Sequence, residues 1–462
     1  MLKHFLKTNT IRQFRIIIIA AAFVFINTIP GHAQFIIGTF IDPCLSTSTD
    51  TTNIAQVKID SASFKKAKDA YFNLLTGYGN SMTLNNTEAG MDYALYIASK
   101  TGLKYLVRDD RFINGAAFNP EIAGSIVKHY KGLDNARRDA MYGYNIIDEP
   151  VLKAAPNVQK WISYFRKNDP DKLAYVNLLP DFGLSSRKEY EKYLDTYLYN
   201  RNPLNNPLVV SYDNYPFHFK DTRNYFYNLY IIRKKAGGRP FWCHPLASEH
   251  LSYINPDENY IRFMVFCPIA YGAKGVIYFT YEKPDEPDYK NAIMTDCTVE
   301  CKYSTIKTIN HYLTDIIAPV VMNSKSLGAF HKSNSGNPTG EILSKEQMLS
   351  SRTPLFADLF GHTLMVGVFQ DNNNASTFYG LVINKGLLKI KNVKIILKGG
   401  DYRTKITVSP SAENYAGNST YTKPDDEEYN SVTNETKIYI DALAGGEGRI
   451  LKVEGVKYIN NK

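Results

Sequence analysis

The segment at residues 141–150, MYGYNIIDEP, places two adjacent carboxylates directly after an apolar, β-branched run. Strand interiors exclude paired carboxylates, and Pro150 cannot donate a hydrogen bond to a strand ladder. Asp148 and Glu149 are therefore expected at the carboxyl end of a strand. Two readings stay open. The pair belongs to a binding or catalytic site, or Asp148 only caps the turn into the next helix.

Other polar and aromatic residues follow neighbouring predicted strands in the same way. They are Asp42, Asn85, Asn86, Arg108, Asp109, Asp181, Asp213, Asn214, Tyr215, Trp242, His244, Glu249, Tyr281 and Glu282. Aromatic rings stack on sugar rings, and amides and acids hydrogen-bond sugar hydroxyls. Two carboxylates can cleave a glycosidic bond when one protonates the leaving oxygen and the other attacks the anomeric carbon. The set lacks lysine, and the chain has neither a nucleophile-elbow serine nor a His-Glu-x-x-His metal motif.

The elements that must position these residues alternate between strand and helix patterns. Eight strand–helix pairs are predicted, with strands at residues 35–40, 81–84, 103–107, 142–147, 173–179, 208–212, 240–243 and 275–280. Eight such pairs over about 285 residues are typical of a (β/α)8 TIM barrel. The alternative is a doubly wound open sheet, which is expected to carry a glycine-rich phosphate turn after an early strand, and that turn is missing.

Helical periodicity disappears after residue 320. Short alternating runs follow, separated by turn residues such as those at 371–374 and 399–400. This pattern favours an antiparallel β-sandwich appended to the barrel. The predicted organisation is a signal peptide at 1–33, a barrel at 34–320 and a C-terminal β-sandwich at 321–462.

The first 33 residues have the composition of an export signal. Four basic residues precede an apolar run at 16–26, and Gly31-His32-Ala33 resembles a cleavage site. An exported protein is expected, periplasmic, secreted or associated with the cell surface, with no integral membrane segment after cleavage. The formal charge of +9 falls to about +5 without those four residues, and no basic cluster points to nucleic acid. The chain's 44% hydrophobic and 21% charged residues are ordinary for a globular protein.

The five cysteines are scattered at 44, 243, 267, 297 and 301. A Cys-x-x-x-Cys spacing alone is weak support for either a metal site or a disulfide, so all five are interpreted as packing residues. Neither a cofactor nor a metal is expected.

The sequence resembles retaining TIM-barrel glycoside hydrolases of clan A, in particular bacterial polysaccharide-degrading enzymes. That resemblance is carried by IIDEP on the fourth predicted strand, YDNYPF at 212–217, AYGAKGVIYFTY at 270–281 and AGGEGRILKV at 444–453. It implies that Glu149 is the acid/base, with Asp148 in place of the family's usual asparagine. It also implies a glutamate nucleophile after strand seven, close to Pro245. The nearest glutamate is Glu249, four residues later, and Asp213 and Glu282 are the fallback carboxylates.

The catalytic prediction is thus Glu149 with Glu249. The predicted substrate-binding residues are Asn85, Arg108, Asp148, Asp213, Tyr215, Trp242, His244 and Tyr281. Structural alternatives stay open for Asp213 as a loop cap, Trp242 as a core residue, His244 as a satisfied histidine and Arg108 as a buried ion-pair partner. The predicted substrate is a β-linked poly- or oligosaccharide, with β-1,3-glucan as the first guess. The alternative function is an inactive barrel that binds glycans for polysaccharide uptake.

Overall fold

The computed structural model describes residues 34–78, 86–113, 116–218, 224–295 and 297–457. The predicted signal peptide, the predicted strand at 81–84 and Asn85 lie outside these ranges. The chain from Phe35 onward forms one compact unit. Within the described residues, every helix is too short or too polar to span a bilayer.

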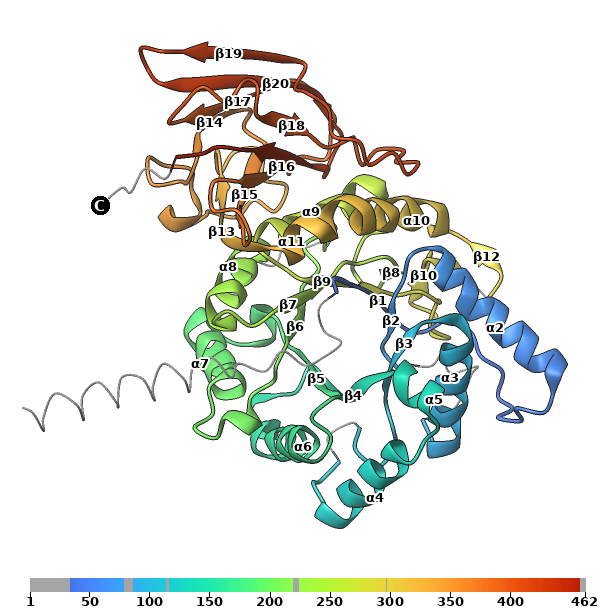
Figure 1. Ribbon diagram of the computed structural model, residues 1–462. Helices are drawn as coiled ribbons and strands as arrows, with labels where there is room; N and C mark the ends of the chain where they lie inside the picture. Colours follow the sequence, from blue (N-terminus) through green and yellow to red (C-terminus); the bar gives the residue numbers. More distant parts are fainter. Residues whose placement is uncertain (1–33, 79–85, 114–115, 219–223, 296, 458–462) are drawn as a thin grey trace, which may run out of the picture. The chain divides into compact units, whose positions relative to one another are not determined.

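Eight parallel strands close into a barrel, which confirms the predicted fold class. Figure 1 shows the strands as a ring with the helices around it. The strands are β1 (Ile36–Phe40), β2 (Leu74–Leu75), β3 (Lys104–Val107), β4 (Met141–Asp148), β5 (Leu173–Leu178), β6 (Val210–Asp213), β7 (Phe241–His244) and β9 (Gly275–Phe279). The fourth strand was predicted at the correct position, and the second strand was not.

The error at β2 has a local cause. Helical periodicity in the sequence extends over residues 63–75, which predicts a helix as far as Leu75, but α2 (Ile54–Asp69) ends at its cap residue Ala70. Leu74 and Leu75 are fully buried, and they pair in parallel with β1 and β3. Two leucines satisfy the helical and the strand pattern equally well, so the apolar pattern could not separate the two structures.

The helices around the barrel bury apolar faces against its outer surface. They are α2, α3 (Glu88–Thr101), α4 (Pro120–Lys131), α5 (Asn135–Ala140), α6 (Ala155–Asn168), α7 (Arg187–Leu198), α8 (Tyr225–Ala236), α9 (Glu258–Ala270) and α10 (Tyr303–Tyr312). The ring of Tyr144, which points outward from β4, stacks on Phe165 of α6 at 4.0 Å between ring centroids. Such contacts fix each strand, and hence each strand end, against its covering helix.

Side chains fill the part of the barrel interior that is farther from the carboxyl ends of the strands. An apolar cluster there includes Ile36, Leu106, Tyr175, Trp242 and Ile277. Buried polar side chains, among them Asn177, Ser211 and His244, lie closer to the carboxyl ends of the strands. The interior is therefore a closed core whose polar groups gather at the face where TIM barrels place their active sites.

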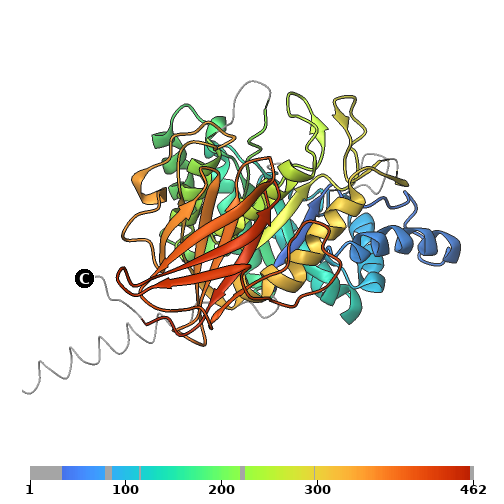
Figure 2. The same ribbon diagram turned by 90° about the horizontal axis from the view of Figure 1, so that it is seen from above.

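Two loops at the carboxyl end of the barrel pair with each other. β8 (Glu249–His250), in the loop after β7, pairs antiparallel with β10 (Tyr289–Lys290), in the loop after β9. In Figure 2 these loops are the yellow-green and yellow segments that project together at the top of the view. We call this pair of strands the mouth ribbon. A second short hairpin follows it, formed by β11 (Met294–Thr295) and β12 (Val299–Glu300).

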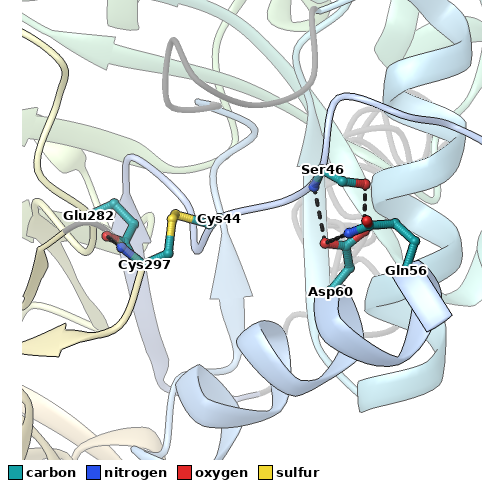
Figure 3. The surroundings of a disulfide bond; sticks show 6 residues. All are labelled: Cys44, Ser46, Gln56, Asp60, Glu282 and Cys297. Atoms are coloured by element: carbon teal, nitrogen blue, oxygen red, sulfur yellow. Dashed lines mark hydrogen bonds between the residues drawn. A yellow bond between two sulfur atoms is a disulfide. The ribbon is translucent and has the colours of Figure 1, made fainter.

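A disulfide joins Cys44, after β1, to Cys297, in the hairpin after β9. The interpretation of all five cysteines as packing residues was therefore wrong for this pair and for Cys301, which is exposed, whereas Cys243 and Cys267 are buried and free. The pairing could not be read from spacing, because the two cysteines are separated by 253 positions. Figure 3 shows the bridge beside Glu282 and, farther along the segment after Cys44, the hydrogen bonds from Ser46 and Gln56 to Asp60.

The chain leaves the barrel through the π-helical turn η4 (Leu313–Ile317) and α11 (Ala318–Met322) and then forms two antiparallel sheets. One has the order β13 (Ser324–His331), β15 (Leu364–Asp371), β16 (Phe378–Asn384), β21 (Gly448–Val453) and β18 (Ile406–Val408). The other has the order β14 (Phe356–Phe360), β17 (Ile390–Lys398), β20 (Glu435–Leu443) and β19 (Asp426–Asn430). Buried residues such as Val366, Ile395 and Leu451 form their shared core. The predicted C-terminal β-sandwich is confirmed.

Candidate active site

The register of four neighbouring strands lines up the polar residues at the barrel's mouth. Asp148 of β4 pairs with Asn177 of β5, and Asn177 pairs with Ser211 of β6. Asp213, two residues further along β6, pairs with His244 at the end of β7. Residues paired across parallel strands point to the same face, so these side chains converge on the barrel axis.

Asn177 is the bridge between two carboxylates. Its Nδ2 donates to Asp148 Oδ1 and to Asp213 Oδ1, each at 2.9 Å. Its Oδ1 accepts from Ser211 Oγ at 3.0 Å. Asp148 thus accepts a side-chain hydrogen bond from the neighbouring strand, and the 3-10 helix that follows, Leu152–Ala154, has Val151 as its N-cap with no side-chain cap. The reading of Asp148 as a simple helix cap is therefore not what the structure shows.

Glu149 occupies the first position beyond β4 with a left-handed backbone, φ 46°. Its N–H donates to the carbonyl oxygen of Asn177 at 2.9 Å, so the ladder to β5 continues while the chain turns. Positive φ is uncommon for a residue with a side chain and is concentrated at functional sites. The turn brings the Glu149 carboxyl into a side-chain hydrogen bond with Asp213.

The three carboxyls at this point strongly perturb one another. Burial, and then the charge of Asp148, raise the pKa of Glu149 to about 7, against the opposing effect of the hydrogen bond with Asp213. Burial also raises the pKa of Asp213 well above its usual range, and the charges of Glu149 and Asp148 add to this. Burial raises the pKa of Asp148, while the hydrogen bond from Asn177 and the charge of Arg108 oppose the rise. The cluster therefore holds at least one proton near neutral pH.

His244 lies below the carboxyls as a neutral hydrogen-bond partner. It is 3% exposed, and burial lowers its pKa to about 3. Its Nε2 is 3.1 Å from the Tyr175 hydroxyl and 3.2 Å from Ser211 Oγ. The predicted site residue thus belongs to the polar network beneath the carboxyls.

Arg108 supplies positive charge from the end of β3. Its guanidinium lies 3.8 Å above the ring of Tyr78, which in turn stacks on Phe40 at 3.8 Å between centroids. The stacked guanidinium is held in place, and its charge favours the ionised form of Asp148. Arg108 was predicted either at the site or as the partner of a buried acid. Its interaction with Asp148 fits both descriptions.

Two aromatic rings outside the predicted set also lie at the mouth of the barrel. Half-buried Phe279, at the end of β9, packs on Phe40, Tyr215 and His250 at centroid distances of 5.4, 5.5 and 5.1 Å. Tyr289 of the mouth ribbon stacks on His250 at 5.0 Å. Burial, then the charges of Glu286 and Asp148, raise the pKa of the Tyr289 hydroxyl. A signal existed for Phe279, which follows a buried strand, but Tyr289 comes from a loop whose pairing the sequence does not reveal.

Three predicted aromatic contacts have different positions. Tyr215 is 6% exposed and packs edge-on against His250 and Tyr253. Trp242 is 2% exposed and stacks on Tyr175 in the barrel interior. Tyr281 is 1% exposed and packs edge-on against Phe72 in the layer between barrel and helices. The structure brings Tyr215 to the edge of the site, whereas Trp242 and Tyr281 are core residues without an open ring face.

Glu249 has a different environment from the other acids. It lies on the mouth ribbon, half-buried, and its Oε2 accepts a hydrogen bond of 3.0 Å from Asn291 Nδ2. The carboxyls that perturb Glu149 are Asp148 and Asp213. Glu282, the other fallback, is 1% exposed and accepts from the backbone N–H of Cys297 at 3.2 Å. Its neighbours Cys44 and Cys297 would complete a metal-like group with it, but their sulfurs are bonded to each other.

No protein-family model matches the chain, and no curated protein matches its sequence. Its fold is similar to a cycloisomaltooligosaccharide glucanotransferase from Paenibacillus sp., at TM-score 0.52 and 7% identity, over 91% of this chain and 85% of that one. A GH27 β-L-arabinopyranosidase from Geobacillus stearothermophilus aligns at TM-score 0.48 and 9% identity, over 93% and 99% of the two chains. A β-galactosidase from Marinomonas ef1 aligns at TM-score 0.41 and 9% identity, over 59% of each chain. Only the first of these alignments has a TM-score above 0.5, and at 7% identity it supports the fold alone.

Proposed function

We propose that this protein is an exported glycoside hydrolase that cleaves a β-linked poly- or oligosaccharide, with Glu149 as its general acid/base. The observation that carries the proposal is the carboxyl of Glu149, whose pKa is raised to about 7 and which is hydrogen-bonded to Asp213 at the mouth of a TIM barrel. A general acid needs a pKa close to the working pH, so that it holds a proton and can still release it.

The hydrogen bonds assign different protonation states to the three acids. Asn177 Nδ2 donates to Asp148 and Asp213, and a donated hydrogen bond favours the ionised carboxylate. The amide of Asn177 gives no such bond to Glu149 among the described contacts, because both of its N–H groups are engaged. For the first step the proposal places the proton on Glu149 and leaves Asp213 ionised, against the burial and the neighbouring charges that raise the pKa of Asp213 well above its usual range.

In the proposed first step, Glu149 gives its proton to the glycosidic oxygen as the bond from that oxygen to the anomeric carbon breaks. A carboxylate on the opposite side attacks the anomeric carbon and forms a glycosyl ester. In the second step Glu149 removes a proton from water, which attacks the anomeric carbon and releases the carboxylate. The net reaction adds one water across the glycosidic bond, and no cofactor takes part.

The contacts favour Asp213 over Glu249 as the attacking carboxylate. Retaining enzymes hold their carboxyls about 5–5.5 Å apart, and inverting enzymes about 6.5–9.5 Å. A hydrogen-bonded pair such as Glu149 and Asp213 is nearer to the retaining spacing, and a sugar entering between them would replace that bond. Glu249, the nucleophile predicted from the family resemblance, stays a prediction, and its hydrogen bond to Asn291 gives it no part in this pair.

The surroundings support a sugar as substrate. Tyr289 of the mouth ribbon interacts with Asp148 and packs on Phe279 of the eighth strand, and Arg108, stacked on Tyr78, acts on Asp148 from the end of the third strand. Aromatic faces beside hydrogen-bonding acids suit a pyranose ring with its apolar faces and equatorial hydroxyls. β-1,3-Glucan is the first candidate because of the family resemblance, and export is proposed from the composition of residues 1–33.

The test is a hydrolysis screen of the wild-type protein on β-glucans, xylans and galactans, with the products sized. Hydrolysis of one β-linked polysaccharide that is abolished in Glu149→Gln supports the proposal. An unchanged rate in Glu149→Gln ends the assignment of Glu149. Product sizes distinguish cleavage within the chain from release of end sugars.

A glycan-binding protein without activity is the second candidate. It is favoured by the position of Glu249, since the mouth ribbon carries this residue away from the barrel strands. Binding of an oligosaccharide by calorimetry, with no product after prolonged incubation, supports this function and contradicts the first.

A further inference from the structure

We propose that Asn177 is a positioning residue that fixes the carboxylates of Asp148 and Asp213 next to Glu149. The inference rests on the proposed function, and it goes beyond it because the amide itself touches no reacting atom. Asn177 holds all three acids. Its two side-chain N–H groups donate to Asp148 and Asp213, and its main-chain carbonyl oxygen accepts from the backbone N–H of Glu149.

The orientation of the Asn177 side-chain amide is set by hydrogen bonds deeper in the barrel. Ser211 Oγ donates to Asn177 Oδ1 at 3.0 Å, which leaves the NH₂ end directed at the carboxyls. The Tyr175 hydroxyl, 2.8 Å from Ser211 Oγ, and His244 Nε2 complete the chain. With its only proton committed to Asn177, Ser211 Oγ accepts from one of these two neighbours. A flipped amide would set a carbonyl oxygen against two carboxylates, so the network selects one orientation.

A purely structural role does not require this arrangement. Asn177 is 2% exposed, and a buried amide needs only enough partners to offset its desolvation. Asn145 of β4 is the matched case. It is 1% exposed, it too lies inside the barrel, and its Nδ2 donates to the backbone oxygen of Thr76. The two asparagines therefore have similar burial, and only Asn177 bonds to carboxylates.

Other charged and titratable groups face the same acids. Arg108 acts on Asp148 from β3, and Tyr78 interacts with Asp148 and Asp213. Tyr193 of α7 interacts with Glu149 and Asp213, Tyr215 interacts with all three acids, and Tyr289 of the mouth ribbon interacts with Asp148. Burial raises the pKa of each of these phenols, so all stay neutral at working pH. Among these groups, Arg108 favours the ionised form of Asp148, and Asn177 favours the ionised forms of Asp148 and Asp213.

The first experiment compares Asn177→Leu with Asn145→Leu in the pH profile of hydrolysis. Loss of the donor raises the pKa of Asp213, so the acidic limb of the Asn177→Leu profile should move up by roughly one pH unit. Turnover at the optimum should fall by about 10²-fold as the carboxyls lose their geometry. Ser211→Ala should shift the limb in the same direction by less. Asn145→Leu should leave the position of the limb unchanged.

The second experiment needs no activity. In Asn177→Leu, Asp148 and Asp213 lose the bonds that favour their ionised forms, so their pKa values in the folded protein rise. The folded variant then binds more protons relative to its unfolded chain than the wild type does, and its stability falls more steeply as pH rises. The loss of Tm relative to wild type should therefore be larger at pH 8 than at pH 5, while Asn145→Leu should show the same loss at both. Equal losses for Asn177→Leu at the two pH values would overturn the proposal. If the wild type hydrolyses no glycan while the pH-dependent loss is found, the proposed function fails and the role of Asn177 in setting the three acids stands.

Discussion

Two glutamates at the mouth of the barrel show how strongly position determines chemistry. Glu149 follows β4, it is held by a backbone bond to β5, and burial and Asp148 raise its pKa to about 7. Glu249 lies on the mouth ribbon and accepts one hydrogen bond from Asn291. Barrel strands fix side chains against a packed core, whereas a two-residue ribbon fixes them through loops. A carboxyl becomes a proton donor at neutral pH where the barrel core desolvates it and a second acid faces it.

The largest expected effect separates these two glutamates by their chemistry. Glu149→Gln should lower hydrolysis of the polysaccharide by about 10²–10⁴-fold, because the amide cannot protonate the leaving oxygen. An aryl glycoside with an acidic phenol needs little protonation, so its cleavage should fall much less. Steady-state kinetics on the two substrates measure the difference. Equal losses on both would show that residue 149 does not act as the acid.

The next effect tests which carboxylate attacks. Asp213→Asn should lower kcat by about 10²-fold or more, since this variant removes the ionised partner of Glu149. Glu249→Gln should change kcat by less than about threefold, because its loss removes a hydrogen bond on the ribbon. The same assay under single-turnover conditions compares the chemical step directly. The reverse order of effects would restore Glu249 as the nucleophile.

The pH dependence sharpens the comparison further. Glu149 must be protonated for the first step, and its pKa is raised to about 7, so the rate should decline as pH rises above about 7. The same limb should persist in Glu249→Gln. Rates from pH 4 to 9 on an oligosaccharide would show this. If the basic limb of the pH profile moves in Glu249→Gln and stays in place in Asp148→Asn, the general acid is Glu249 on the mouth ribbon and not Glu149.

The smallest effect on catalysis is expected from the disulfide. Cys44→Ser combined with Cys297→Ser should lower the free energy of unfolding by about 2–4 kcal/mol, because the bridge closes a long loop of the unfolded chain. The basic limb of the pH profile should stay in place, since Glu149 and Asp213 are held by barrel strands. Thermal unfolding measures the loss, and Cys301→Ser, which removes an exposed free thiol, is the control. A loss equal to that of Cys301→Ser would show that the bridge does not stabilise the fold.

The sequence was sufficient for what depends on local pattern. The alternation of strand and helix patterns predicted the barrel, and the short alternating runs after residue 320 predicted the sandwich. The abrupt change from two isoleucines to Asp148 and Glu149 placed these acids at the end of the fourth strand. The sequence was insufficient for what depends on pairing between distant segments. The opposing acid of Glu149 comes from β6, the amide that links Asp148 to Asp213 is a single polar residue inside β5, and Cys297 pairs with Cys44 over 253 positions of sequence.

The same limit explains the aromatic residues. Trp242 and Tyr281 were predicted to contact sugar because they follow strands seven and eight, but one lies inside the barrel and the other outside it. Position near the end of a strand does not fix the face or the depth of a ring. Tyr281 lies outside the barrel, whereas Trp242 points inward but belongs to the apolar interior. Tyr289, which interacts with Asp148 and packs on Phe279, makes these two rings the candidates for sugar contact instead.

The most direct test of the account is a crystal structure of Glu149→Gln with a bound β-linked oligosaccharide. The account predicts a glycosidic oxygen within hydrogen-bond distance of the side chain at position 149, and the neighbouring anomeric carbon facing Asp213. An oligosaccharide bound along the mouth ribbon at Glu249, with its glycosidic oxygens beyond reach of position 149, would contradict it.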